Sequence, residues 1–240
     1  MKFLITGGAS GLGNAITCAI AKTYPGSKVY FTYHSSIENA KELERQFGNT
    51  NGMQCDFTSE SNISELCDFI RDTGIDILVN NAITGLNKQY FHKTSESYFI
   101  DCFAHDILPV LRITQAFILQ AREARFGKII TILSAALNST PPIGWSVYLA
   151  NKAYLLSMHK SWATENKDFN ITSNCVSPGF MVTPLHGDLD ERIIEDMVNN
   201  HPFKQLLTVE DTAQVVLSLC NPELMQNDQH IIIDSSQNIK

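Results

Sequence analysis

The sequence lacks the features that mark several classes of protein. It has no Lys/Arg-rich run, and 25 acidic against 18 basic residues give a net charge of −7, whereas proteins that bind duplex nucleic acid usually carry a basic patch. It has no apolar run of about eighteen residues, which a membrane-spanning helix needs. Internal repeats and low-complexity linkers are also absent. We therefore expect no nucleic-acid partner and no membrane partner.

Metal and redox motifs are missing as well. No two of the six cysteines lie within ten residues of each other, which excludes a CxxC pair and the usual zinc spacings. The seven histidines form no HxH or HExxH pattern, so we expect no metal. Scattered cysteines are typically buried small hydrophobes. Only three apolar residues lie between Lys2 and Thr6, too few for the core of a signal peptide. We expect a reducing compartment, the cytoplasm.

The 240 residues are within the size of one domain, whose upper range is roughly 250 residues. Short apolar, β-branched runs alternate with helical patterns, which is typical of βαβ units and a parallel sheet. We predict an α/β fold of the Rossmann type, a single domain over residues 1–240 with seven strands and about six main helices on both faces of one doubly wound sheet. The predicted strands are Lys2–Thr6, Lys28–Thr32, Met53–Asp56, Ile75–Val79, Lys128–Leu133, Asn170–Val176 and Ile231–Ile233. A long helical stretch from about Glu96 to Ala124 contains Pro109, which predicts a kink.

A glycine-rich turn, Thr6-Gly-Gly-Ala-Ser-Gly-Leu-Gly13, follows the first predicted strand at once. Glycines let the backbone approach a pyrophosphate, and the N-terminus of the next helix offers free N–H donors and a partial positive charge. The spacing is G-x-x-x-G-x-G and not the more common G-x-G-x-x-G. A turn of this kind can also serve only to close a strand–helix junction. Its place in the first βα turn of the chain favours dinucleotide binding.

Tyr148 and Lys152 are four residues apart in a predicted helix, and this spacing puts both side chains on one face. An ammonium near a phenol lowers the pKa of the phenol, which makes it a usable general acid or base near neutral pH. Tyr24 and Lys28 have the same spacing, but a Pro-Gly pair between them excludes a shared helical face. The Tyr148–Lys152 pair is therefore the candidate for acid–base chemistry.

Polar residues follow three further predicted strands. Ser134 ends the fifth strand, Asn80-Asn81-Ala82 ends the fourth, and Ser177-Pro178-Gly179 ends the sixth, with Thr183 close behind. The carboxyl ends of parallel strands are where ligands bind in such sheets. A hydroxyl at Ser134 can donate a hydrogen bond to a substrate carbonyl oxygen.

In these motifs the sequence resembles the short-chain dehydrogenase/reductase family, in its short single-domain branch, and is similar to the 3-oxoacyl reductases and related ketoreductases. The resemblance covers almost the whole chain, from the glycine turn through Asp56, Asn-Asn-Ala, Ser134 and the Tyr-x-x-x-Lys pair to the Pro-Gly-Phe-Met-Val-Thr segment. It implies an NAD(P)(H)-dependent oxidoreductase that transfers a hydride between the nicotinamide and a ketone or secondary alcohol.

The resemblance also implies a role for individual residues. Tyr148 is expected to act as the general acid/base, Ser134 to hold the carbonyl, and Lys152 to hold the nicotinamide ribose and lower the pKa of Tyr148. Asp56 is expected to contact the adenine and Thr183 the nicotinamide carboxamide. The full set expected to bind the cofactor is Thr6, Gly7, Ser10, Gly11, Leu12, Gly13, His34, Ser35, Asp56, Phe57, Asn80, Ala82, Tyr148, Lys152, Pro178, Gly179 and Thr183.

Three features depart from the family pattern. One is the family's closing Asp-Gly-Gly, which reads Asp234-Ser235-Ser236 here and concerns subunit packing more than chemistry. The family's Asn-Asn-Ala-Gly reads Asn-Asn-Ala-Ile83 here, which removes a glycine beside the cofactor. The family's helical asparagine, which holds a water in a proton relay, aligns with Asp106. Its carboxylate can accept hydrogen bonds from water or Lys152, so we include Asp106 among the expected catalytic residues.

These departures keep a second hypothesis open: a dinucleotide-binding protein of the same fold with weak or lost catalysis and a regulatory or scaffold role. The intact Ser134, Tyr148 and Lys152 argue against it. A sugar-nucleotide epimerase or dehydratase of the extended branch is disfavoured by the glycine spacing and by the lack of a C-terminal substrate domain.

The end of the second predicted strand bears on the choice of cofactor. An acidic residue there selects the free ribose hydroxyl of NAD, and the stretch from Tyr33 to Ser36 has none. Hydroxyls and His34 can receive a 2′-phosphate, which favours NADP(H) over NAD(H). Ser10 argues the other way, because phosphate-selective relatives often carry a basic residue at its position. Ser35 and Ser36 can also simply cap the next helix.

Residues 184–206 correspond to the mobile lid that covers the substrate in the family. Apolar residues in and just before this segment favour an apolar or acyl-like substrate, although a core-facing helix shows the same pattern. The helices around Glu96–Ala124 and Ser146–Asn166 resemble the family's dimer surfaces. We therefore expect a homodimer or homotetramer and a small-molecule carbonyl or alcohol substrate.

Overall fold

The structure of the protein is a computed structural model, and it describes residues 1–187 and 190–234. Seven parallel strands form one sheet in the order β3-β2-β1-β4-β5-β6-β7. The predicted fold class is thus confirmed. The strands are β1 (Lys2–Ile5), β2 (Lys28–Tyr33), β3 (Thr50–Gln54), β4 (Ile77–Asn80), β5 (Gly127–Ile132), β6 (Ile171–Pro178) and β7 (His230–Ile233).

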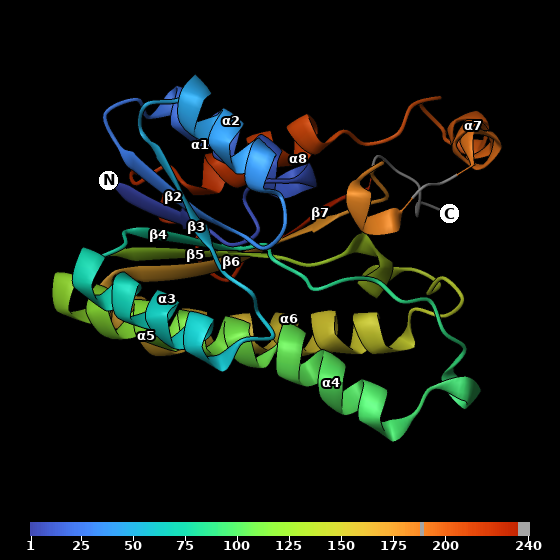
Figure 1. Ribbon diagram of the computed structural model, residues 1–240, viewed down its shortest axis with the longest axis horizontal. Helices are drawn as coiled ribbons and strands as arrows, with labels where there is room; N and C mark the ends of the chain where they lie inside the picture. The colour runs from blue at the N-terminus through green and yellow to red at the C-terminus, as the bar shows by residue number, and fades with distance from the viewer. Residues whose placement is uncertain (188–189, 235–240) are drawn as a thin grey trace.

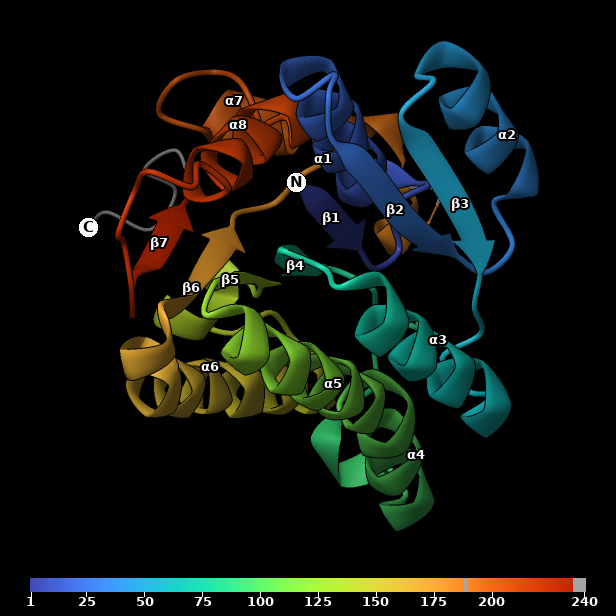
Figure 2. The same cartoon turned by 90° about the vertical axis from the view of Figure 1, so that its left-hand side faces the viewer.

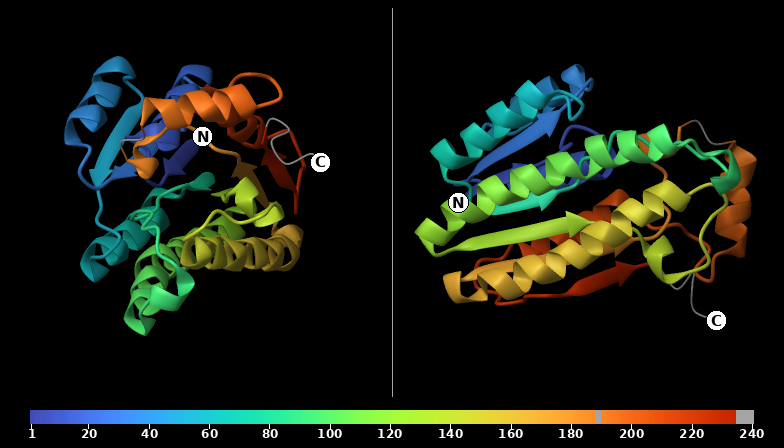
Figure 3. Two further views of the ribbon diagram at one scale, coloured as in Figure 1. Left: turned by 90° about the vertical axis from the view of Figure 1, so that its right-hand side faces the viewer. Right: turned by 90° about the horizontal axis from the view of Figure 1, so that it is seen from below.

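Helices cover both faces of the sheet. α1, α2 and α8 lie on one face and α3, α5 and α6 on the other, as Figures 1 and 2 show. α4 and α7 extend past the carboxyl ends of the strands (Figure 3). The helices are α1 (Gly11–Thr23), α2 (Ile37–Gln46), α3 (Glu60–Thr73), α4 (Glu96–Asp106), α5 (Leu108–Ala124), α6 (Ser146–Asn166), α7 (Glu191–Asn200) and α8 (Val209–Leu219), with short 3-10 turns η1 (Phe91–Lys93), η2 (Ala135–Asn138), η3 (Lys167–Phe169) and η4 (Pro184–His186).

The apolar residues of the central strands divide between two cores. In β1, Phe3 and Ile5 join the core under α1, α2 and α8, while Leu4 joins the core under α3, α5 and α6. β4 alternates in the same way. Because successive side chains of a strand point to opposite faces, a strand that is buried on both sides must be apolar throughout. This explains the continuous apolar runs from which the strands were predicted.

Near Pro109, where a kink was expected, one residue interrupts the helical stretch and divides it into α4 and α5. Ile107 is both the C-cap of α4 and the N-cap of α5, and Pro109 lies in the first turn of α5. Proline is tolerated there because the first N–H groups of a helix have no partner within the helix. This break and the amphipathic helix α7 account for the two α-helices beyond the expected six within the described residues.

The stretch Glu96–Ala124 is long and apolar enough to cross a membrane, a test that the core helices of soluble proteins also pass. Its second half, α5, buries Ile113, Phe117 and Ala121 in the core under the sheet. The absence of a membrane partner remains a prediction.

A buried histidine makes the stability of the fold depend on pH. His159 on α6 is 0% exposed, and its Nε2 lies 3.7 Å from Oδ1 of Asp228. Burial lowers the pKa of His159 and outweighs the opposing effect of the Asp228 carboxylate. Since the unfolded chain binds this proton more readily, the free energy of unfolding is expected to be highest above about pH 6.5 and to fall below it, by at most about 1.4 kcal/mol per pH unit from this group.

Replacing His159 with glutamine is expected to reduce this acid-side slope in urea unfolding at pH values between about 5 and 8. Part of the slope will remain, because burial also lowers the pKa of His230. His92→Gln, at an exposed position, is the control. A His159→Gln variant with the full wild-type slope would contradict the assignment.

Candidate active site

A cavity of about 1070 Å³ opens at the carboxyl ends of the strands, at the upper end of the roughly 300–1,000 Å³ of ligand sites. It is continuous from the glycine turn, past the end of β2, to α6 and α7. The predicted site residues that line it are Gly7, Ser10, Gly11, Leu12, Gly13, His34, Ser35, Asp56, Phe57, Ala82, Ser134, Tyr148, Lys152, Pro178, Gly179 and Thr183. Residues from seven separate parts of the sequence therefore meet in one cavity.

The glycine turn fits a pyrophosphate. α1 begins at Gly11, and its N-cap residue Ser10 makes no side-chain cap hydrogen bond, so the first N–H groups of the helix have no helical partner. Gly7 and Gly11 have φ values of 65° and 49°, which glycine adopts without strain. A Cβ added at Gly13 would lie 2.0 Å from the carbonyl oxygen of Gly7. The turn is therefore tight enough to require glycine. The N–H groups of Gly7 and Gly8 donate to Thr32, so the free donors available to an anion are those at the start of α1.

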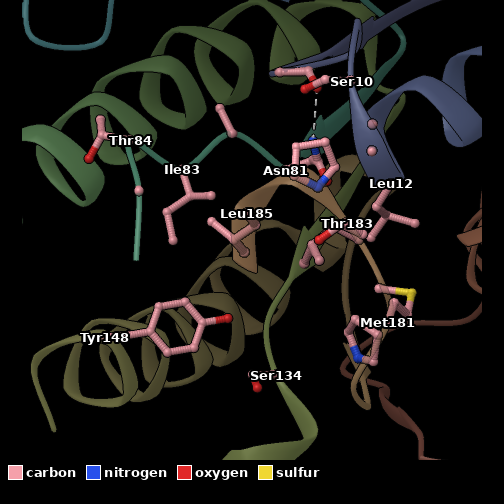
Figure 4. Close-up of a pocket in the computed structure, with 18 of the residues that line it drawn as sticks. Ser10, Leu12, Asn81, Ile83, Thr84, Ser134, Tyr148, Met181, Thr183 and Leu185 are labelled. Atoms are coloured by element: carbon pink, nitrogen blue, oxygen red, sulfur yellow. Dashed lines mark hydrogen bonds between the residues drawn. The ribbon is translucent and has the colours of Figure 1, made fainter. Parts of the chain in front are cut away.

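Tyr148, Ser134 and Lys152 form a group at the other end of the cavity. The Tyr148 phenol points from α6 into the cavity, with Ser134 on one side and Ile83 and Leu185 on the other (Figure 4). The Ser134 hydroxyl lies near enough to the phenol to lower the pKa of Tyr148, and it accepts from the N–H of Ala136 at 3.3 Å. Lys152 Nζ donates to the carbonyl oxygen of Ile132 at 2.8 Å and lies 5.7 Å from the centre of the Tyr148 ring.

The pKa of Tyr148 differs from the sequence expectation. Burial above all, with a smaller contribution from the Asp106 charge, raises it to about 12, and the Ser134 hydroxyl opposes this rise. Burial also lowers the pKa of Lys152 to about 8. The expected lowering by Lys152 was wrong for this structure, because desolvation dominates and the ammonium lies beside the ring, bound to a backbone carbonyl. The Tyr148 phenol therefore holds its proton at neutral pH.

Thr6 and Asn80, both predicted to bind the cofactor, lie beneath the cavity and do not line it in the described structure. Thr6 is fully buried, and its hydroxyl accepts from the N–H groups of Asn81 and Ala82 at 2.9 and 3.0 Å. Asn80 donates to Thr114 Oγ1 at 3.0 Å. Both residues shape the turn after β4 and support the site from below.

The neighbouring Asn81 lines the cavity and was missed. Its Nδ2 donates to the carbonyl oxygens of Thr6 and Gly7 at 2.9 and 3.2 Å, so it joins the glycine turn to the end of β4. The Asn-Asn pair indicated that one of the two side chains faces the cavity. Because β4 ends at Asn80 and successive side chains point to opposite faces, the structure was needed to show that it is Asn81. Trp145 was also missed; its ring stands at 5.4 Å from that of Tyr148 in a T-shaped arrangement.

Asp106, the last residue of α4, is not among the described residues that line the cavity. Its Oδ1 accepts from the N–H of Thr84 at 2.9 Å and from Thr84 Oγ1 at 2.7 Å. The carboxylate thus holds Thr84, which lines the cavity. Its charge raises the pKa of Tyr148 and of Lys152.

An imidazole and a carboxylate lie close together at the end of the cavity beside β2. His34 Nε2 lies 3.6 Å from Asp56 Oδ2, and Thr58 donates to Asp56 Oδ1 from its N–H and its hydroxyl. These hydrogen bonds are the main reason why the pKa of Asp56 is lowered. Ser36 occupies the N-cap position of α2, but its side chain makes no cap hydrogen bond. Ser35 and Ser36 both line the cavity, so the capping interpretation of this serine pair receives no support.

The predicted lid, residues 184–206, contains η4 and α7; its residues 188–189 lie outside the described residues. Leu185, Ile193 and Met197 line the cavity, while none of the residues of α7 is buried. Of the two interpretations of this apolar segment, a core-facing helix is therefore excluded. Across residues 1–187 and 190–234, no three His, Cys, Asp or Glu side chains lie together as metal ligands do.

Comparisons with known proteins agree with this geometry. A family described as "Enoyl-(Acyl carrier protein) reductase" matches residues 7–235. The 3-oxoacyl-(acyl-carrier-protein) reductase of Aquifex aeolicus is 30% identical over 226 residues, which are 91% of this chain and 89% of that protein. The chain belongs to the short-chain dehydrogenase/reductase family.

Two further members of the family are similar to it. The 7alpha-hydroxysteroid dehydrogenase of Escherichia coli is 28% identical over 224 residues, 91% of this chain and 86% of that protein. A solved structure of a short chain dehydrogenase from Burkholderia cenocepacia in complex with NADP has a TM-score of 0.83 and 25% identity, and the match covers 97% of this chain and 96% of that one.

Proposed function

We propose that this family member is an NAD(P)(H)-dependent oxidoreductase that interconverts a ketone and a secondary alcohol, with reduction of the ketone as its main direction. One observation carries the proposal: Tyr148, Ser134 and Lys152 meet in the cavity that begins at the glycine turn. The relatives named above, a 3-oxoacyl reductase and a hydroxysteroid dehydrogenase, support the reaction class. The same geometry disfavours a scaffold role, since an inactive site has no need of the complete group.

The residues of this chain divide the work as follows. The bound dinucleotide supplies or takes up the hydride at the substrate carbon. The Ser134 hydroxyl holds the carbonyl oxygen, and the Tyr148 phenol gives its proton to that oxygen in reduction and takes it back in oxidation. Lys152 holds the ribose hydroxyls. Because burial raises the pKa of Tyr148 to about 12, the phenol holds its proton at neutral pH, which favours reduction.

We propose NADP(H) as the preferred cofactor. His34, Ser35 and Ser36 line the cavity at the end of β2, with no acidic residue in that stretch, and a 2′-phosphate can accept hydrogen bonds from all three. The NADP complex of the similar Burkholderia cenocepacia structure supports this choice. Asp56 beside His34 contacts the adenosine end and keeps the imidazole in place.

Fluorescence titration with NADPH and NADH tests the cofactor proposal. We expect NADPH to bind at least about tenfold more tightly, the effect of one charge-assisted hydrogen bond. His34→Ala is expected to reduce this ratio, while Lys41→Ala on the exposed surface of α2 leaves it unchanged. Equal Kd values would contradict the preference, and no binding of either nucleotide would contradict the oxidoreductase assignment.

Residues 184–206 are proposed to form a lid over an apolar substrate, since Leu185, Ile193 and Met197 line the cavity opposite the glycine turn.

We also propose a homodimer or homotetramer. Ile100, Leu108 and Leu119 on α4 and α5 are 61%, 44% and 61% exposed. Association of two subunits through these helices would remove this apolar surface from water. A monomer in light scattering would refute this assembly. All six cysteines are free thiols, which supports the proposed cytoplasmic location.

A further inference from the structure

Of the three departures from the family pattern, Ile83 and Asp106 meet in space, while Ser235 and Ser236 of the third lie outside the described residues. Asp106 ends α4, and Ile83 precedes Thr84 in the segment that follows β4. Oδ1 of Asp106 accepts two hydrogen bonds from Thr84, one from its N–H at 2.9 Å and one from its hydroxyl at 2.7 Å. Both distances are within the usual range, and hydrogen bonds to a carboxylate are stronger than those between neutral groups.

The segment held in this way forms one wall of the cavity. Ile83 and Thr84 both line it, on the side that faces Tyr148 (Figure 4). Between β4 and η1 the chain has no regular structure. The Thr6 hydroxyl fixes its start at Asn81 and Ala82, and Gln89 donates from its N–H to the carbonyl oxygen of Gly144 at 3.1 Å near its end. Asp106 supplies the anchor between these points.

The charge of Asp106 reaches the reacting group as well. The carboxylate raises the pKa of Tyr148 and of Lys152, although Asp106 is not one of the described residues in contact with the cavity. The titratable groups that face this cluster are Tyr98 and Cys102 on α4, Tyr148 and Lys152 on α6, and Cys175 on β6.

We propose that Asp106 is a positioning residue: its carboxylate clamps Thr84, which holds Ile83 as a fixed wall over the substrate, and its negative charge sets the pH range of the reaction. This inference rests on the proposed reductase function. It assigns Asp106 no direct contact with the reacting atoms, in place of the catalytic role expected from the sequence. Ile83 takes the place of a glycine at this wall and narrows the space beside Tyr148, so the clamp also contributes to the choice of ketone.

Three variants separate the clamp from the charge. Asp106→Asn keeps an oxygen that can accept from Thr84 but removes the charge. Thr84→Val keeps the charge and the backbone hydrogen bond but removes the hydroxyl. Asp106→Ala removes both charge and clamp. Asp101→Asn makes the same chemical change at an exposed position of α4 and is the matched control.

The hydrogen-exchange rate of the Thr84 amide reports its hydrogen bond to Asp106 and requires no enzymatic turnover. In Asp106→Ala this amide is expected to exchange at least about tenfold faster, because its acceptor is gone. In Asp106→Asn and in the Asp101→Asn control it stays close to the wild type. Unchanged exchange in Asp106→Ala would overturn the clamp.

Ketone reduction reads the consequences. Asp106→Ala is expected to raise KM by about tenfold, and Thr84→Val is expected to raise it by less. In both variants the change in kcat is expected to be smaller than the change in KM. Asp106→Asn is expected to keep KM and to shift the alkaline limb of the pH profile down by about 1 pH unit, because Tyr148 then loses its proton more easily. Profiles of Asp106→Asn and wild type that coincide would overturn the role of the charge. Failure of the wild type to reduce any ketone would refute the proposed function instead, and the exchange measurement would still decide the clamp.

Discussion

Replacing Tyr148 with phenylalanine is expected to lower kcat/KM for ketone reduction by about 10²- to 10⁴-fold, the usual contribution of a general acid. The ring stays in place between Trp145 and the cavity, but no proton donor remains where the substrate oxygen gains negative charge. The Ser134 hydroxyl near the phenol stays in place and can still hold the substrate oxygen, so the variant removes the proton donor alone. Steady-state kinetics with NADPH and an apolar ketone measure the effect.

The control is Tyr154→Phe on the same helix. Tyr154 is 38% exposed, and its ring packs against Phe103 outside the cavity, so this variant should react at the wild-type rate. NADPH is expected to bind to Tyr148→Phe within about threefold of the wild-type Kd, since the phenol is only one of many contacts with the dinucleotide. Wild-type turnover by Tyr148→Phe would rule out the assignment of Tyr148. A joint loss of NADPH binding and turnover would show that the residue supports the cofactor instead of the chemistry.

The strands were predictable because the sheet is buried on both faces. Residues such as Phe3, Leu4 and Ile5 are each buried in one of the two cores. Each strand therefore shows in the sequence as a continuous apolar run bounded by turn residues. α7 gave a weaker signal, because no residue of this helix is buried and its apolar face serves the cavity. The break at Ile107 required knowledge of how two helices pack, since proline fits equally well in a kink or in the first turn of a new helix.

The site was predictable wherever position along a strand decides it. Ser134 and the glycine turn follow strands directly, and the edge of a parallel sheet brings such residues together. Directions of side chains and the balance of charges were not predictable. Whether Asn80 or Asn81 faces the cavity depends on which residue ends β4. Whether Lys152 or burial controls the pKa of Tyr148 depends on distances in space, which the spacing of residues along the sequence does not give. Asp106 illustrates the same limit, because its partner Thr84 lies 22 residues away along the chain.

The glycine turn gives the second large expected effect: Gly13→Ala should abolish tight dinucleotide binding and destabilise the fold. The added Cβ would lie 2.0 Å from the Gly7 carbonyl oxygen and 2.6 Å from Nδ2 of Asn81. Because the nearest atom belongs to the backbone, the turn itself has to open, which costs about 1–3 kcal/mol or more of unfolding free energy. Opening it also moves the Gly7 carbonyl that accepts from Asn81.

A series of three glycine variants makes this prediction quantitative. Gly26→Ala, where a Cβ meets nothing within 4 Å, should leave the Kd for NADPH and the melting temperature within error of wild type. Gly11→Ala should be intermediate: its φ of 49° disfavours alanine by about 1 kcal/mol, but a Cβ there meets Pro184 and Thr183 only at ordinary contact distances of 3.5 and 3.6 Å. Gly13→Ala should raise the Kd by well over tenfold, since the N–H groups of the turn no longer converge on the pyrophosphate. Equal Kd values and melting temperatures across the series would mean that the turn only closes the junction between β1 and α1, and the dinucleotide site would have to lie elsewhere in the cavity.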